Sequence, residues 1–342
     1  MVYSKSRVYL PNRNSLSMHS VENYKVVFEQ YLGQGHFTRE PNGLYEPVNY
    51  ILRMGGKRLR PLLALMGYHV FADDFRQALP VAMAVELFHN FSLIHDDIMD
   101  EAPLRRGIPT VHSHFGLNAG ILSGDVMLIY AQQYLLDAAD APLNVRLLKS
   151  FNRCAIQVCE GQQWDVDFER MDTVTIPQYL RMIEYKTAVL LGCSLEMGAM
   201  TAGASDSDLH HLYEFGRKLG IAFQLQDDLL DTFGDAGKFG KKTGGDIVQN
   251  KKTFLILKAL ELADSVAKAN LLRLISTPTT DEQAKIQEVT TLLRQFKAPD
   301  LAKEERNHYH HQAIRHLDQV AVPDVRKLPL YELAEFLLDR DL

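Results

Sequence analysis

Hydrophobic residues recur at intervals of three and four along most of this chain, from about Val21 to the C-terminus. This spacing is typical of helices with one apolar face, and the sequence shows no runs in which Val, Ile or Thr alternate with polar residues as in strands. The pattern predicts an all-α protein. No Pro- or Ser-rich linker divides the middle of the chain, so we expect residues 21–342 to form a single large helical domain, preceded by a flexible arm at residues 1–20.

Individual helices can be placed by their apolar stripes and by the Pro and Gly residues between them. The first is expected over Val21–Leu32, and Pro61 is expected to open another apolar helix. A loop between these two is marked by Gly33, Gly35, Pro41, Gly43 and Pro47. Later helices are expected over Val81–Asp100, Ser123–Ala138, Val145–Trp164, Thr175 to about Met200 and, after Pro323 and Pro329, over Leu330–Leu338.

The helix over Val81–Asp100 ends in three carboxylates, Asp96, Asp97 and Asp100. Because a helix turns by about 100° per residue, Asp96 and Asp100 lie on the same face, one turn apart. Their charges repel each other near the electronegative end of the helix, so we expect a cation between them.

A second copy of this acidic pattern occurs later in the chain. Asp227, Asp228 and Asp231 have the same spacing and again end a long apolar helical run. A single acidic cluster would be typical of a solvated helix end, but two matched copies indicate a function.

Basic residues gather next to each acidic motif and in one further stretch. Arg105 and Arg106 follow the first motif, and a glycine-rich loop with five lysines, Thr232–Lys252, follows the second. The further stretch, GGKRLRP at residues 55–61, has two glycines that allow a close turn and leads into a helix N-terminus, where backbone amides attract anions. Acidic motifs beside basic ones suit a polyanion that is held partly by divalent metal and partly by direct basic contacts.

Composition and charge exclude several classes of protein. With 46% hydrophobic and 23% charged residues the chain is typical of a globular protein, and its net charge of -6 argues against a nucleic-acid-binding surface. The N-terminus lacks the apolar core of a signal peptide, and the most apolar segment, Ala188–Ala204, is too short to span a bilayer. We therefore expect a cytoplasmic protein without a membrane span. The three cysteines, Cys154, Cys159 and Cys193, lie in apolar helical sequence, which predicts buried free thiols.

Together, three motifs resemble those of the trans-isoprenyl diphosphate synthases, the polyprenyl synthetase family: GGKRLRP at residues 55–61, DDIMD at 96–100 with RRG after it, and DDLLD at 227–231 with a lysine-rich loop after it. The resemblance covers roughly residues 25–340 in order and spacing. It implies an all-α bundle whose two aspartate motifs face each other across a deep central cavity. It also implies a prenyltransferase that joins isopentenyl diphosphate head to tail to an allylic diphosphate (dimethylallyl, geranyl or farnesyl diphosphate).

By motif position, the resemblance also implies roles for individual residues. Asp96, Asp100 and Asp227 would hold Mg²⁺, about three ions in all, for which Mn²⁺ could substitute. The carboxylates that would support these ions through water are Asp97, Asp228 and Asp231. The allylic diphosphate would contact Arg105, Lys186, Lys241 and Lys251, and isopentenyl diphosphate would contact Lys57, Arg60, His89 and Arg106.

The implied chemistry fits these residue types. An allylic carbon releases diphosphate when the charge of the leaving group is neutralised, which metal ions and cationic side chains accomplish. The allylic cation that remains needs dipoles but no strong nucleophile. The hydroxyl of Thr187, the amide oxygen of Gln224 and a main-chain carbonyl near Lys186 suit this need. In this family the departing diphosphate is thought to remove the last proton, so no protein base is expected.

Product length is expected to depend on the helix that carries the first acidic motif. The growing chain should run back along this helix, so that Ser92, Phe91 and Phe88, four, five and eight positions before Asp96, become walls of the pocket. In this family, an aromatic residue at the fifth position before the first aspartate is typical of short-chain enzymes. The sequence therefore favours geranylgeranyl diphosphate (C20), with farnesyl diphosphate (C15) as the alternative.

The resemblance further suggests a homodimer, whose interface could be formed by the apolar helices around Ala119–Ala138. One position departs from many relatives, because Asn250 precedes Lys251 where they have glycine. This departure concerns the geometry of the loop rather than the catalytic lysine.

Three other interpretations remain open at this point. A class I terpene cyclase shares the first acidic motif but normally has Asn, Ser or Thr, and Glu in the second. A di-iron helix bundle would use the Glu-x-x-His pairs Glu86/His89 and Glu305/His308, although the second pair lies in a His-rich stretch that resembles a solvated face. A non-catalytic partner subunit would not need the complete acidic and basic sets found here.

Overall fold

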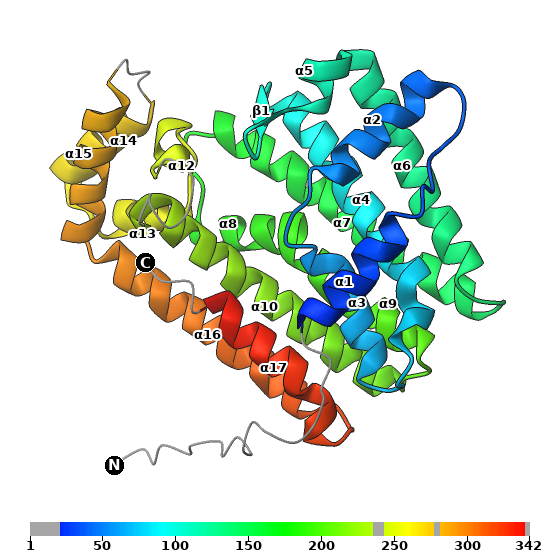
Figure 1. Cartoon of the computed structure of the whole chain (residues 1–342). Coiled ribbons are helices and arrows are strands. Elements are labelled where there is room, and N and C mark those ends of the chain that lie inside the picture. Colours follow the sequence, from blue (N-terminus) through cyan, green and yellow to red (C-terminus); the bar gives the residue numbers. More distant parts are fainter. Residues whose placement is uncertain (1–20, 235–242, 277–280, 339–342) are drawn as a thin grey trace, which may run out of the picture.

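The computed structural model describes residues 21–234, 243–276 and 281–338, and helices account for most of this part of the chain (Figure 1). The strands in the described residues are β1 (Leu104–Arg105) and β2 (Ile108–Pro109), a short antiparallel pair around the turn that contains Arg106. The prediction of an all-α protein is thus confirmed, and the apolar pattern did not indicate the small hairpin.

The helices follow one another in a single series. They are α1 (Val21–Leu32), α2 (Asn42–Arg53), α3 (Leu59–His69), the 3-10 turn η1 (Phe75–Ala78), α4 (Leu79–Met99), α5 (Val111–Phe115), α6 (Leu117–Asp137), α7 (Leu143–Arg170), α8 (Ile176–Ile183), the π segment η2 (Glu184–Ala188), α9 (Val189–Thr201), α10 (Asp206–Phe233), α12 (Gly245–Val248), α13 (Phe254–Leu262), α14 (Ser265–Ser276), α15 (Glu282–Gln295), α16 (Ala298–Asp318) and α17 (Asp324–Leu338).

The packing of these helices creates two clusters of buried apolar side chains. The larger cluster lies among α1–α4, α6, α7, α9 and the first half of α10, and includes Leu63, Leu87 and Phe215. The second lies among α8, α13–α15 and the second half of α10, and includes Leu229 and Leu255. In Figure 1 the long helices α10 and α16 lie side by side, and each supplies residues to both clusters. On α10 the change from the larger to the second cluster falls near Leu219 and Ile221, and the acidic motif follows beside the second cluster.

Close helix packing depends on small residues at two positions of α10. A Cβ atom added to Gly216 would lie 2.8 Å from the Cα of Gly192, and one added to Gly220 would lie 2.6 Å from the Cα of Ala188. Real Cβ atoms do not approach other atoms this closely, so these two glycines allow α10 to contact the backbone of α9 and the π segment directly.

Two segments that were predicted to be irregular are helical instead. Gly43 and Pro47 lie inside α2, where the burial of Val48, Ile51 and Leu52 offsets the hydrogen bond that the proline cannot make. Pro329 likewise lies inside α17, which begins at Asp324 rather than at Leu330. In both cases tertiary burial outweighs the local preference of proline.

The prediction of three buried thiols was wrong for one cysteine. Cys154 and Cys193 are buried as predicted, but Cys159 is exposed, because it lies on the outer face of α7. Among the described residues, no helix is both long and apolar enough to cross a membrane.

Candidate active site

Two adjoining cavities lie beside the second acidic motif. The larger one, about 630 Å³, is bordered by the loop before α3, the middle of α4 and the last turns of α10. The smaller one, about 150 Å³, is bordered by α7, α8, the π segment and the residues after α12. Both cavities are lined by Gln224, Asp228 and Asp246, so the acidic end of α10 separates them.

In the first acidic motif, at the end of α4, the three carboxylates have different environments. Asp97 is buried and accepts two hydrogen bonds from Nε of Arg105, at 2.8 and 2.9 Å, and one from Nη2 at 2.7 Å. Asp96 is 3.4 Å from the Nζ atom of Lys186. Burial, followed by the charge of Asp96, raises the pKa of Asp100. The motif thus places several carboxylates close together at one helix end, the ligand type that a divalent cation prefers.

The second motif, at the end of α10, is held in place by hydrogen bonds. Asp228 is buried, accepts a hydrogen bond from the Tyr179 hydroxyl, and accepts another from the Gln224 amide at 3.2 Å. Burial and the neighbouring charge of Asp246 raise the pKa of Asp228 to about 7. Asp231 accepts a hydrogen bond from the backbone N–H of Asp246 at 2.9 Å, which attaches the start of α12 to α10. Asp227 lines the larger cavity.

The π segment connects the two acidic motifs. The Nζ atom of Lys186 donates a hydrogen bond to Asp165 of α7 at 2.6 Å and contacts Asp96 of the first motif. The hydroxyl of Thr187 donates to the Gln224 side-chain oxygen at 3.4 Å, and Gln224 in turn contacts Asp228 of the second motif. A π turn inside a helix re-aims side chains and is frequent at functional sites. Here it directs two consecutive residues toward two different acidic groups.

Gly161 of α7 makes this geometry possible. A Cβ atom at this position would lie 2.2 Å from the backbone nitrogen of Lys186, far inside van der Waals contact. The backbone of the π segment therefore packs directly against α7, and this contact fixes the position from which the Lys186 side chain extends.

A cluster of cationic and titratable groups lines the larger cavity. The side chains of Arg60 and His89 are 3.2 Å apart, and the buried Nε atom of Arg60 has no hydrogen-bond partner among the described residues. Burial lowers the pKa of Arg60 to about 10, and burial together with Arg60 and Arg106 lowers the pKa of His89 well below its usual range. An unpaired N–H donor among like charges indicates a site for an anion.

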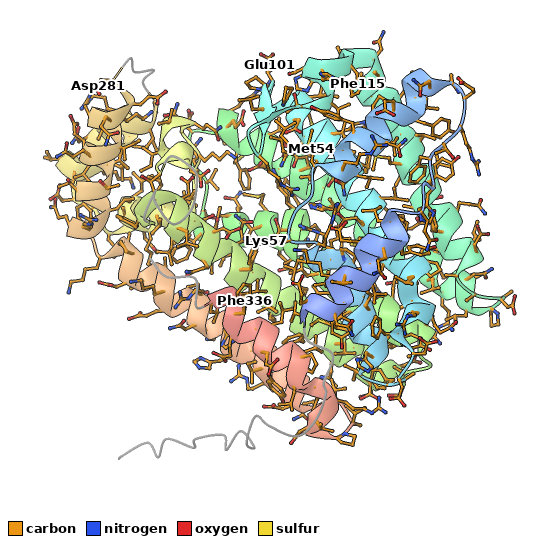
Figure 2. The ribbon with its side chains drawn as sticks, in the orientation of Figure 1. Met54, Lys57, Glu101, Phe115, Asp281 and Phe336 are labelled. Carbon is orange, nitrogen blue, oxygen red and sulfur yellow. The ribbon has the colours of Figure 1, made fainter. Side chains whose placement is uncertain are left out.

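The loop before α3 positions this cluster. Gly56 has φ +139°, and a Cβ atom there would lie 2.6 Å from Nη1 of Arg106, which donates a hydrogen bond to the Gly55 oxygen. Figure 2 shows the neighbouring Lys57 near the centre of the view, far from Asp281 and Phe115 at the periphery. Gly56 thus allows the close approach of an arginine side chain to the backbone, and the positive φ of Gly55 and Gly56 fits the close turn that the motif predicted.

Arg58, which lies between Lys57 and Arg60 in the sequence, is bound by other parts of the protein. Its guanidinium is buried and donates hydrogen bonds to Glu86 and to the Leu52 oxygen, both at 2.5 Å, and to Glu29 at 2.9 Å. Its backbone has a left-handed conformation, with φ 51°. All three basic residues of the motif border the larger cavity, but Arg58 is paired with carboxylates and fixes the loop, whereas Lys57 and Arg60 remain the candidates for binding a ligand.

Residues 41–293 match the family model described as polyprenyl synthetase, and this match decides the family of the chain. The chain belongs to the polyprenyl synthetase family. It is a prenyltransferase, a short-chain isoprenyl diphosphate synthase, as the sequence motifs predicted.

Curated members of the polyprenyl synthetase family are similar over most of their length. Geranylgeranyl pyrophosphate synthase of Geoglobus acetivorans is 38% identical over 306 residues, which cover 89% of this chain and 92% of the relative. Geranylfarnesyl diphosphate synthase of Natronomonas pharaonis is 36% identical over 320 residues, with the same coverage of 89% and 92%. These two relatives are named for different products, so similarity at this level leaves the product length undetermined.

Solved structures from the family share the fold. A crystal structure of a geranylgeranyl pyrophosphate synthase has a TM-score of 0.90 and 42% identity and covers 95% of this chain and 100% of that chain. The geranylgeranyl pyrophosphate synthase from Corynebacterium glutamicum, complexed with isoprenyl diphosphate and magnesium, has a TM-score of 0.82 and 28% identity, with coverage of 94% and 98%. The isoprenoid synthase fold predicted from the motifs is thereby confirmed.

Most of the predicted site residues lie together in the structure. The two cavities are lined by Lys57, Arg60, His89, Arg106, Lys186, Thr187, Gln224, Asp227, Asp228, Asp231 and Lys251. Arg105 contacts Asp97 and Asp96 of the first motif, and the charge of Lys251 lowers the pKa of Asp100, which opposes the effect of Asp96. Lys241 lies outside the described residues.

The unusual Asn250 is accommodated by its backbone. It has φ 60°, a left-handed conformation that favours glycine and is also accessible to asparagine. Its side-chain oxygen accepts a hydrogen bond from Lys285 of α15 at 2.5 Å. The asparagine therefore keeps the turn that glycine would make before Lys251 and adds a contact to α15.

The residues proposed to limit product length form an aromatic row on α4. Phe88 is fully buried, and its ring centroid lies 5.2 Å from that of Phe151 on α7 and 5.6 Å from that of Phe91. Phe91 is partly buried and lies 4.8 Å from the ring of His95, whereas the Ser92 hydroxyl donates to the backbone oxygen of His89. Neither of the two cavities described above is lined by these residues.

Sequence reasoning missed several residues of the site. Asp165 pairs with Lys186, Tyr179 donates to Asp228, and Asp246 lines both cavities. In the sequence, Tyr179 looks like part of the apolar face of a helix, and Asp165 looks like another acidic residue on a polar face. No local signal distinguishes them, because their partners are 49 and 21 residues away in the sequence.

The alternative interpretations can now be judged. The di-iron interpretation was wrong, because Glu86 is an ion-pair partner of Arg58 at 2.5 Å and His308 is exposed and contacts Gln312. Family membership also removes the terpene cyclase interpretation, in agreement with the second motif of three aspartates.

Proposed function

We propose that this enzyme condenses isopentenyl diphosphate with an allylic diphosphate, head to tail, and that its main product is geranylgeranyl diphosphate (C20). The observation that carries the proposal is the position of the π segment, whose Lys186 contacts the first acidic motif while Thr187 reaches the second through Gln224. The cluster of Arg60, His89 and Arg106 provides a separate anion site on the far side of Asp228.

The donor set around the π segment fits magnesium. Asp96, Asp100 and Asp227 would hold the ions, because Mg²⁺ prefers carboxylate oxygens and usually shares its coordination sphere with substrate phosphates. Burial, followed by the charge of Asp96, raises the pKa of Asp100, so two carboxylates act on each other at this helix end. When bound, about three Mg²⁺ ions would neutralise the diphosphate of the allylic substrate and so make it a better leaving group.

The residues of the chain supply the remaining steps. Lys186, Arg105 and Lys251 lie at the first acidic motif, where they bind and orient the allylic diphosphate. As the C–O bond breaks, the Thr187 hydroxyl and the Gln224 oxygen present negative dipoles to the allylic cation without a nucleophile strong enough to trap it. Isopentenyl diphosphate is held by Lys57, Arg60, His89 and Arg106, and its double bond attacks the cation. The new carbocation then loses a proton to the diphosphate that was released, which restores a double bond.

Phe91 supports a product of intermediate length. Five residues of α4 separate it from Asp96, a rise of about 7.5 Å along the helix, and its ring meets both Phe88 and His95 there. Growth in this direction would meet an aromatic barrier backed by Phe151 of α7. Ser92 is small and leaves the adjacent position open, which favours C20 over C15.

Product analysis of the wild type and of Phe91→Ala tests this assignment. We expect C20 from the wild type and longer products from Phe91→Ala at nearly unchanged turnover, because the substitution removes a wall and no charge. Phe336→Ala, at an exposed position of α17, is the matched control and should leave the product length unchanged. A wild-type product of C15 or C25 would refute the C20 assignment, and an unchanged distribution for Phe91→Ala would refute Phe91 as the barrier.

The metal requirement has its own test. Activity should vanish in excess chelator and return with Mg²⁺ or Mn²⁺, and Asp96→Ala and Asp227→Ala should each lower kcat by orders of magnitude while the fold survives. Removing a like charge from an acidic cluster rarely destabilises a protein. Turnover at an undiminished rate in chelator would contradict the mechanism.

The proposal includes a homodimer formed through α6. This helix exposes a row of apolar side chains, and several of them recur at the spacing of one helix face. They are Ile121, Ile129 and Leu136, with Leu117 and Leu122 beside them, and their exposed fractions range from 40% to 62%. A contiguous exposed apolar surface of this kind is typical of an interface, and a twofold axis would pair the row with its own copy.

A further inference from the structure

A cluster of three histidines joins α10 to α16 at the opposite end of α10 from the second acidic motif. His210 and His211 lie in the second turn of α10, and His316 lies in the last turn of α16. Their ligand atoms all lie within 4.8 Å of one another. The cluster has no part in the proposed reaction, because the 16 residues from His211 to Asp227 correspond to about 24 Å of helix.

The geometry of the cluster matches that of a metal site. The Nδ1 atoms of His211 and His316 are 3.2 Å apart. Two imidazole nitrogens bound tetrahedrally to one zinc ion, with bonds of 2.0–2.1 Å, lie about 3.3 Å from each other. His210 is exposed, so its ring can rotate toward the same point, and its centroid is already 5.4 Å from that of His211 and 6.0 Å from that of His316.

The surroundings of His316 favour the neutral form of its imidazole, which a metal requires. Burial lowers the pKa of His316, and the neighbouring His211, His210 and Lys218 add to this effect, whereas Glu214 opposes it. The Glu214 carboxylate is engaged by Arg217 at 2.5 and 3.0 Å, which keeps it from neutralising the cluster. Within the part of the chain that the structure describes, the cluster contains three nitrogen donors and no carboxylate, which favours a transition metal ion over Mg²⁺.

We propose that His210, His211 and His316 bind one divalent transition metal ion, with Zn²⁺ as the best match, and that a water molecule completes its coordination. The site is separate from the acidic motifs and takes a different class of ion. Because its ligands come from the start of α10 and the end of α16, a bound ion links the two long helices that carry residues of both core clusters.

Equilibrium dialysis of the full-length protein without an affinity tag tests the proposal. The protein is equilibrated with Zn²⁺ in the presence of excess Mg²⁺, and the bound zinc is counted for the wild type, His211→Ala and His316→Gln. We expect each variant to bind one equivalent of zinc fewer than the wild type, so that the difference excludes zinc held by the acidic motifs. Magnesium-supported activity should be unchanged, because neither residue lines the catalytic cavities.

A histidine of the same helix provides the matched control. His311 is exposed on α16 and is not a member of the cluster, so His311→Ala should bind as much zinc as the wild type. Zinc should also raise the thermal midpoint of the wild type and of His311→Ala, but not of the two cluster variants. Equal zinc content in the wild type and in correctly folded cluster variants, judged by circular dichroism and by activity, would overturn the proposal.

Discussion

The buried pair of Arg58 and Glu86 gives the sharpest test of how the basic motif is built. Both side chains are 3% exposed and lie 2.5 Å apart, and Arg58 also meets the more exposed Glu29 at 2.9 Å. Removing one partner of a buried pair leaves a charge without solvent or counter-ion, at a cost of about 3–5 kcal/mol. Arg58→Met should therefore lower the free energy of unfolding by about that amount.

A double-mutant cycle separates this pairing from simple loss of packing. In the combined variant Arg58→Met and Glu86→Leu, apolar groups of similar size replace both charges, so no buried charge is left uncompensated. Asn90, which donates to the Glu86 side chain at 3.1 Å, keeps its bond to the Glu86 backbone oxygen at 2.8 Å. We expect the double variant to be less destabilised than the sum of the single variants by at least about 2 kcal/mol.

Urea unfolding followed by circular dichroism, at one fixed protein concentration, measures all four stabilities. Arg53→Met is the matched control, because Arg53 pairs with Glu46 at 3.5 Å with side chains that are 72% and 40% exposed. Such a surface pair contributes about 0–1 kcal/mol. Strictly additive losses at Arg58 and Glu86, or an equal loss for Arg53→Met, would refute the assignment of the stability to the buried pair.

Three further predictions concern other parts of the molecule. Gly161→Ala should lower kcat because the added Cβ displaces the π segment. Gly43→Ala is the control, since a Cβ at that position has no atom within 4 Å, and it should leave kcat unchanged. Equal kcat values for the two variants would contradict the packing argument. Ile129→Glu should shift a homodimer to monomer in analytical ultracentrifugation, and Val266→Glu, at a position 81% exposed on α14, should leave the assembly unchanged. The pKa of Asp228, raised from 3.8 to about 7, makes the folded state bind a proton more tightly than the unfolded state. This carboxyl should therefore reduce the stability of the metal-free protein as the pH rises from about 4 to about 7, and Asp228→Asn should flatten that slope in thermal melts.

The sequence alone determined the helical class, the place of most helices and the chemistry of the site. These properties are local, because the spacing of apolar residues sets the buried face of a helix, and two acids four residues apart share a face wherever the helix lies. The first helix, Val21–Leu32, has the bounds that its pattern predicted, and Thr175 and Gln178 form the capping box that starts α8. The acidic motifs could therefore be recognised, and a cation between them could be predicted, from the sequence.

Tertiary structure decided which groups meet. Lys57 and Arg58 are adjacent and both basic, yet Arg58 alone is buried among carboxylates, because the turn gives it a left-handed backbone that the sequence does not specify. The π segment at Lys186 depends on contact with Gly161, and the histidine cluster depends on α10 lying beside α16. Contacts between residues far apart in the chain are set by the packing of whole helices, and no periodicity within a single helix encodes them.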